Sequence, residues 1–124
     1  MIEDSGGAGT FRGGLGVIRR TRALAPLNVH TQIERTECAP WGLAGGLEGT
    51  RNRVHIERAD GSRTTSADGK IRERLVAGDT VVIETGGGGG FGNPLERDRE
   101  RVGADVRAGY VSREAAQRDY GFQD

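Results

Sequence analysis

The sequence predicts a mainly β protein, an antiparallel sandwich or barrel-like sheet with glycine-rich turns, followed by a C-terminal helical hairpin. Short segments before residue 92 alternate apolar and polar side chains, which is the period-two pattern of half-buried strands. Glycine, at 22 of 124 residues, recurs between these segments. No strand alternates with a longer helical pattern, which argues against a doubly wound α/β fold.

The predicted strands follow one another closely. Alternation favours strands at residues 27–33 and 54–56, and short apolar runs favour further strands around residues 17–18, 75–76 and 81–83. Asp60-Gly61 is typical of a hairpin turn, and Asp79 is most simply a turn residue between the last two strands. His30 falls on the polar face of its strand, where we expect it to be solvated.

The last residues change to a helical pattern. Asn93 can cap a helix and Pro94 suits its first turn, while Gly109 is a suitable terminator. Ser112 then caps a second helix that stops before Gly121. The apolar stripe of the first helix is narrow and consists of Leu95, Val102 and Val106. We therefore expect this hairpin to dock on the β portion or on a partner.

These patterns divide the chain into a β-rich, glycine-rich domain at residues 1–92 and a helical hairpin docked on it at residues 93–124. Only 34% of the residues are hydrophobic, so side chains that can fill a core are scarce, and self-association or marginal stability is expected. The sequence therefore predicts a portion of a larger assembly.

Charge and cysteine content exclude several classes of protein. Eighteen basic residues balance 18 acidic ones, which argues against nucleic acid or an anionic membrane as a partner. No apolar run approaches the ~20 residues of a membrane span, and the N-terminus does not resemble a signal peptide. Cys38 is the only cysteine, and we expect a buried, inert thiol in a cytoplasmic protein.

The most informative stretch is a glycine run after the apolar residues 81–83. The candidate site consists of Gly86, Gly87, Gly88, Gly89, Gly90, Phe91 and Gly92. No lysine follows the run, so it is not a phosphate-binding Walker loop, and it lacks the βαβ unit of a dinucleotide fold. Two interpretations remain open. The run is either an anion-binding nest of backbone N–H groups or a crossover packed closely against another backbone.

Other chemistry-bearing residues give weak signals. His30 and His55 are far apart and lack partners at zinc-ligand spacing, so we expect no metal site. Trp41 lies among glycines, where it lines a pocket or packs over them as local core. No G-x-S-x-G elbow indicates a serine hydrolase, and catalytic residues stay unassigned.

Four segments together resemble the C-terminal region of the hydantoinase B/5-oxoprolinase family, which also includes subunits of acetone and acetophenone carboxylases. They are residues 4–9 with 12–16, residues 40–46, Gly78-Asp79 with residues 84–94, and residues 102–112 with 119–121. Three positions depart from the family pattern. Gly86 replaces the usual proline, Phe91 the usual tyrosine and Asn93 the usual aspartate.

The resemblance implies an ATP-dependent cyclic-amide hydrolase that works with a hydantoinase A-type subunit. That subunit uses ATP to phosphorylate the amide carbonyl, and the B-type subunit supports hydrolysis of the activated ring. Family members are several times longer, so the chain is expected to be a C-terminal fragment of a B-type subunit and inactive alone. ATP and a divalent metal are expected only in the complete complex. The alternative is a non-catalytic structural or anion-binding module.

Overall fold

The computed structural model describes residues 1–123, and its chain separates into two compact units. The β unit comprises residues 18–38 and 51–85. The glycine-rich unit comprises residues 1–17, 39–50 and those from Gly86 onward. The structure is mainly antiparallel sheet with two C-terminal helices, which confirms the predicted fold class. The division expected at residue 92 stays a prediction.

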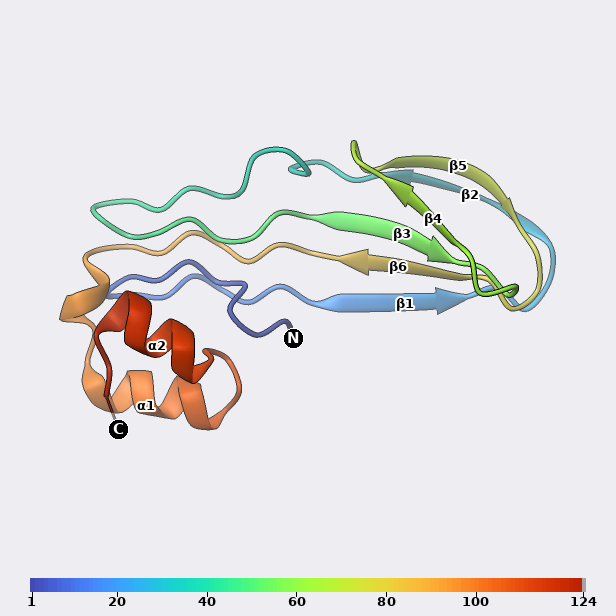
Figure 1. Cartoon of the computed structure of the whole chain (residues 1–124). Coiled ribbons are helices and arrows are strands. Elements are labelled where there is room, and N and C mark those ends of the chain that lie inside the picture. The colour runs from blue at the N-terminus through green and yellow to red at the C-terminus, as the bar shows by residue number, and fades with distance from the viewer. Residues whose placement is uncertain (124) are drawn as a thin grey trace. The chain divides into compact units, whose positions relative to one another are not determined.

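The β unit contains six strands in two antiparallel sheets (Figure 1). Their bounds are β1 Ile18–Arg22, β2 Leu27–Gln32, β3 Arg53–Glu57, β4 Arg63–Ser66, β5 Lys70–Leu75 and β6 Thr80–Glu84. The larger sheet has the order β1-β6-β3-β4, and β2 pairs with β5 in the smaller one. Every strand except β4 overlaps a segment that the sequence predicted, although β1 and β5 overlap theirs only at Ile18 and Leu75. β4 carries only short polar side chains beside its arginine, so it has no apolar alternation to reveal it.

The core of the β unit lies between apolar residues of the two sheets. Its buried members are Ala23, Val54, Ile56, Ile71, Leu75 and Val81, with Val29, Ile33 and Ile83 packed against them. In the register, Val54 is opposite Ile83 and Ile56 is opposite Val81. Partners across an antiparallel pair share a face, so these side chains point together into the core.

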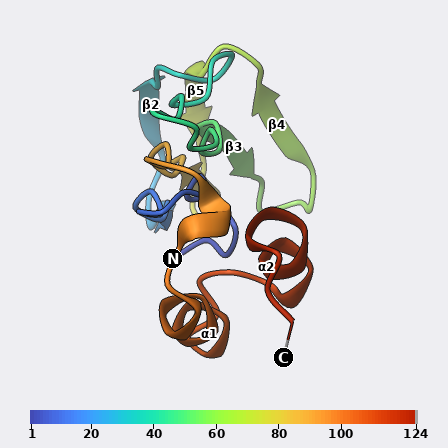
Figure 2. The same ribbon diagram turned by 90° about the vertical axis from the view of Figure 1, so that its left-hand side faces the viewer.

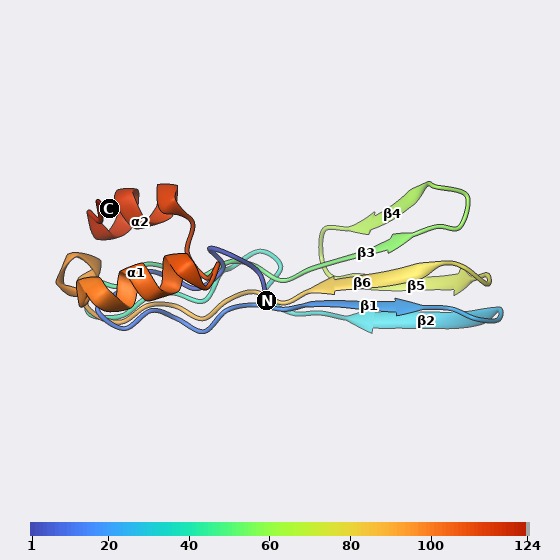
Figure 3. The ribbon, with the colours of Figure 1, turned by 90° about the horizontal axis from the view of Figure 1, so that it is seen from below.

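The glycine-rich unit holds extended segments and all the helices. The segments run alongside one another without forming regular strands (Figure 3). The helices are a 3₁₀ turn η1 Pro94–Glu96, α1 Arg99–Arg107 and α2 Arg113–Tyr120 (Figure 2). The prediction of a single helix from Pro94 to Gly109 was therefore wrong. The backbone is extended at Arg97, and α1 starts from a separate cap at Asp98.

Local capping explains where these helices begin and end. The side chains of Asn93, Asp98 and Ser112 accept hydrogen bonds from the backbone N–H of Leu95, Arg101 and Ala115. Gly121 ends α2 with φ of 59°, a conformation that glycine adopts without a steric penalty. The helices share a buried cluster with the glycine-rich segments, formed by Ala8, Val102, Val111, Ala115, Ala116 and Tyr120.

Candidate functional site

The glycine run lies so close to a neighbouring segment that Gly87 and Gly90 have no room for a side chain. A Cβ added at Gly87 would lie 2.0 Å from the carbonyl oxygen of Ser5, and one at Gly90 would lie 2.1 Å from that of Ala8. Ser5 and Ala8 are three residues apart, as are Gly87 and Gly90. The two backbones therefore touch every third residue.

A second segment meets the run with the same period. A Cβ added at Gly46 would lie 2.2 Å from the carbonyl oxygen of Gly90, and one at Gly49 would lie 2.2 Å from that of Gly87. A Cβ at Gly89 would come within 1.9 Å of the carbonyl oxygen of Trp41. The contacts recur every three residues, which is the repeat of a polyproline II helix. Successive glycines of the run therefore point toward different neighbouring segments.

Backbone N–H groups along the run already donate to acceptors within the same unit. These bonds join Gly87 to Thr50 Oγ1, Gly88 to the carbonyl of Gly14, Gly90 to that of Leu47, Phe91 to that of Phe11, and Gly92 to that of Leu43. Within the run, only Gly92 has a positive φ, at 77°. Close approach of backbones, rather than left-handed conformation, accounts for glycine at Gly87, Gly89 and Gly90. An anion-binding role stays a prediction.

Asp105 of α1 is the centre of a buried ion-pair cluster. Its carboxylate accepts from Nε of Arg12 at 3.0 Å and from Nη2 of Arg97 at 2.9 Å. The three side chains are only 9–14% exposed. Arg97 also donates to the carbonyl of Thr10, and Arg12 lies over the ring of Tyr110 at 5.5 Å. One carboxylate therefore links α1, the N-terminal segment and the residue between η1 and α1.

Tyr120 borders the same cluster from α2. Burial raises the pKa of its hydroxyl, while Arg97 and Arg12 act in the opposite direction. The hydroxyl of Tyr120 and Nε of Arg97 are buried and have no hydrogen-bond partner among the described residues. One feature of the sequence could have indicated this cluster. Asp105 lies three residues after Val102, so a charged side chain falls on the apolar side of α1.

The N-terminal motif ties the same unit together. The hydroxyl of Ser5 is fully buried, donates to the carbonyl of Ile2 at 2.6 Å and accepts from the N–H of Gly16 at 2.8 Å. The carboxylate of Asp4 accepts from the N–H of Ser112, the cap residue of α2. Short side chains in this motif thus satisfy backbone groups of three different segments.

Asp79 is confirmed as a turn residue, between β5 and β6, and its carboxylate is almost fully buried. It accepts from the N–H groups of Val76 and Ala59 and from the guanidinium of Arg58. Hydrogen bonds from Val76 and Ala59, opposed by burial and assisted by Arg58, lower the pKa of Asp79 below its ordinary 3.8. The ionised carboxylate therefore stabilises the folded turn.

Replacing Asp79 by asparagine should weaken the dependence of stability on acid. Because its pKa is lower in the folded chain, Asp79 contributes stability above the unfolded value of 3.8, and this is lost as pH falls through the folded value. Urea unfolding at about pH 6 and at about pH 3 measures this dependence. The free energy of unfolding should fall less between the two pH values for Asp79→Asn than for the unmodified chain. Parallel profiles of the two proteins would contradict this assignment.

Several residues singled out from the sequence lie at the surface. Trp41 is 68% exposed and belongs to neither buried cluster, since the surrounding glycines offer it no side chains. Its role in a pocket stays a prediction. Phe91 is 52% exposed, with its ring 6.4 Å from that of Phe11.

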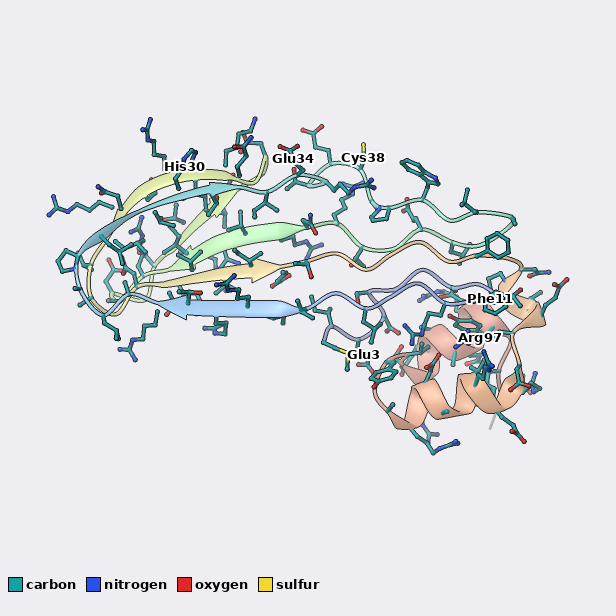
Figure 4. All side chains as sticks on the ribbon, turned by 180° about the vertical axis from the view of Figure 1, so that it is seen from behind. Glu3, Phe11, His30, Glu34, Cys38 and Arg97 are labelled. Carbon is teal, nitrogen blue, oxygen red and sulfur yellow. The ribbon has the colours of Figure 1, made fainter. Side chains whose placement is uncertain are left out.

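The expectation of a buried Cys38 was wrong, because the thiol lies on an exposed loop (Figure 4). His30 is exposed, as predicted from its place on the polar face of β2. His55 lies 3.4 Å from Glu57, the second residue after it along β3. The two histidines are on different sheets, His30 on β2 and His55 on β3.

Two kinds of feature are absent from residues 1–123. No group of three or more histidine, cysteine, aspartate or glutamate side chains there could hold a metal ion. None of the helices in that range is long and apolar enough to cross a membrane.

The family model described as hydantoinase B/oxoprolinase matches residues 1–94. The chain belongs to this family. The B-type subunit of a putative D-/L-hydantoinase from Pseudomonas sp. strain NS671 is 31% identical over 122 residues, covering 98% of this chain and 21% of that protein. The beta chain of the caprolactamase from Pseudomonas jessenii is 37% identical over 133 residues, covering 98% and 22%.

The crystal structure of the ATP-dependent caprolactamase from Pseudomonas jessenii superimposes with a TM-score of 0.78 at 28% identity. The match covers 97% of the present chain and 21% of the solved one. This hydantoinase B-family chain therefore spans about a fifth of the length of these two relatives.

Proposed function

We propose that the chain is the C-terminal part of a B-type subunit of an ATP-dependent cyclic-amide hydrolase, acting with an A-type, ATP-using subunit in the cytoplasm. Membership of the hydantoinase B/oxoprolinase family supports the reaction class. Likeness to proteins named as the B-type subunit of a hydantoinase and the beta chain of a caprolactamase supports a role as one subunit among several.

The observation that carries the proposal is the family match over residues 1–94, and the packing of the glycine run supports the part that this chain plays. Segments that resemble the family surround residues 86–92 with backbone contacts and take up its N–H groups. We infer that this unit is a rigid scaffold of the B-type subunit, which supports the activated ring's hydrolysis without carrying the reacting groups. The described residues contain no group of three or more metal-ligating side chains, and we infer that ATP and the divalent metal bind elsewhere in the complete complex.

Purified alone, the chain should turn over neither ATP nor a cyclic amide. The assay supplies ATP and Mg²⁺ with hydantoin, 5-oxoproline or caprolactam and measures ADP and ring-opened product together. We expect both to equal those of a heat-inactivated sample, because the A-type subunit that activates the amide carbonyl is absent. ADP released in proportion to the opened ring would overturn the proposal.

A chimera tests the scaffold role directly. This chain replaces the matched region of the beta chain of the Pseudomonas jessenii caprolactamase, which is combined with the other components of that enzyme. We expect ATP-dependent caprolactam hydrolysis from the chimera and its loss when Gly89 is replaced by valine, whereas Gly88→Ala should retain it. A folded chimera without activity would contradict the proposed function.

The second candidate is a non-catalytic structural module that serves an assembly without this chemistry. The close backbone packing of the glycine run favours it as well. The chimera separates the two, because a module from an unrelated assembly would not restore hydrolysis. Stabilisation of the isolated chain by inorganic phosphate would instead favour the anion-binding form of this alternative.

A further inference from the structure

The β unit is open on the side between β1 and β2. A hollow of about 260 Å³ lies there, with a floor formed by Leu27, Val29, Leu75, Val81 and Ile83. Apolar side chains of the core therefore border an unfilled space, and no further strand of the described residues covers them on this side.

Both strands that border this hollow are edge strands. Among the described residues, β1 pairs only with β6 and β2 pairs only with β5. Every residue of β1 is exposed. An edge strand presents a row of peptide N–H and C=O groups outside the ladder, which is a template for another strand.

The edge is strongly basic. Three of the five residues of β1 are arginines, and Arg19 and Arg22 line the hollow together with His30 of β2. Arg20 and Arg22 share one face of β1, because side chains alternate along a strand. Over the whole β unit, 11 basic residues stand against 8 acidic ones. This charge favours an acidic occupant.

Two other occupants fit less well. Pairing β1 with a second copy of itself would bring arginines of both strands together, and like charges opposite each other destabilise a sheet. A single-stranded nucleic acid needs aromatic rings on which bases stack, and no phenylalanine, tyrosine or tryptophan lines the hollow.

We propose that this groove binds an extended protein segment in which aliphatic and acidic side chains alternate, added as a strand to the free edge of β1. Strand addition supplies main-chain hydrogen bonds, and every second side chain enters a pocket. The aliphatic side chains cover the floor around Val81 and Ile83. The acidic ones lie on the opposite face, beside Arg22, while Arg20 on that face already pairs with Glu57 of β3. The proposal concerns the β unit alone and does not depend on the reaction proposed above.

The test uses the full chain and a fluorescein-labelled peptide of about eight residues in which valine and glutamate alternate. Fluorescence anisotropy should show saturable binding of one peptide per chain. Arg22→Glu should weaken binding at least about tenfold, because it places an acid beside the peptide's acids.

Arg63→Glu is the matched control, because Arg63 is an exposed arginine of β4 in the same cross-strand row as Arg22, at the opposite edge of the sheet. Arg63→Glu changes the net charge by the same amount as Arg22→Glu. It should leave the affinity for the peptide within about twofold of that of the unmodified chain.

Two further peptides test the pairing of backbones. Each carries N-methyl groups at alternate residues, one on each edge of the strand. Only one edge can face β1, so one peptide should bind and the other should not. The proposal is overturned if no binding saturates, if a valine–lysine peptide or a single-stranded oligonucleotide binds equally, or if both methylated peptides behave alike. A dimer through β1 that excludes the peptide would overturn it as well.

Discussion

Replacing Gly89 by alanine should lower the free energy of unfolding by about 3 kcal/mol, at the upper end of the cost of overpacking. The new methyl group would lie 1.9 Å from the carbonyl oxygen of Trp41, 2.5 Å from its carbon and 2.9 Å from the amide nitrogen of Gly42. All three are backbone atoms, which cannot rotate away as the end of a side chain can. Urea unfolding followed by circular dichroism measures the change.

The adjacent Gly88 provides the matched control. A Cβ there would meet the amide nitrogen of Gly14 at 3.5 Å, an ordinary contact, and its φ is not positive. Gly88→Ala should therefore be neutral or stabilise by up to about 0.4–1 kcal/mol, through the reduced freedom of the unfolded chain. If Gly89→Ala were as neutral or stabilising as Gly88→Ala, the run would be a flexible linker.

The same geometry separates the remaining glycines of the run. Gly87→Ala and Gly90→Ala should behave like Gly89→Ala, because their added methyl groups would meet backbone oxygens at 2.0 and 2.1 Å. Gly92→Ala combines positive φ with an approach of 2.6 Å to the Thr10 hydroxyl, so it should also destabilise. The contrast with Gly88→Ala is therefore the sharpest measure of packing in this unit.

Replacing Asp105 by asparagine should destabilise the chain by about 3–5 kcal/mol, the usual cost of breaking a buried ion pair. The substitution keeps the shape of the side chain but leaves Arg12 and Arg97 charged and buried with one neutral acceptor between them. Urea unfolding at neutral pH measures the loss.

Asp119→Asn provides the control in the same unit. It removes the same charge from a pair whose arginine, Arg118, is 68% exposed. Exposed pairs contribute about 0–1 kcal/mol, so this variant should stay close to the unmodified chain. If Asp105→Asn cost no more than Asp119→Asn, the cluster would not be a structural centre of the glycine-rich unit.

Local patterns in the sequence sufficed for much of the fold. Alternation of side chains predicted β2 and β3, because burial on one face of a sheet imposes a period of two. Short apolar runs indicated β6 and touched β1 and β5 at one residue each. Short polar residues before the helices and Gly121 after α2 predicted the helical hairpin, because caps act within one turn. The segments that resemble the family were enough to identify it.

Contacts between distant segments decided the remainder. The sequence alone determined that residues 86–92 need glycine for some backbone reason, but not which one. That depends on carbonyl groups of Ser5, Ala8 and Trp41, far away in the chain. The meeting of Arg12 and Arg97 at Asp105, the break before α1 and the exposure of Trp41 likewise appear only once the segments pack. The physical reason is that periodicity and capping are local properties, whereas close approach and burial depend on residues brought together by the tertiary structure.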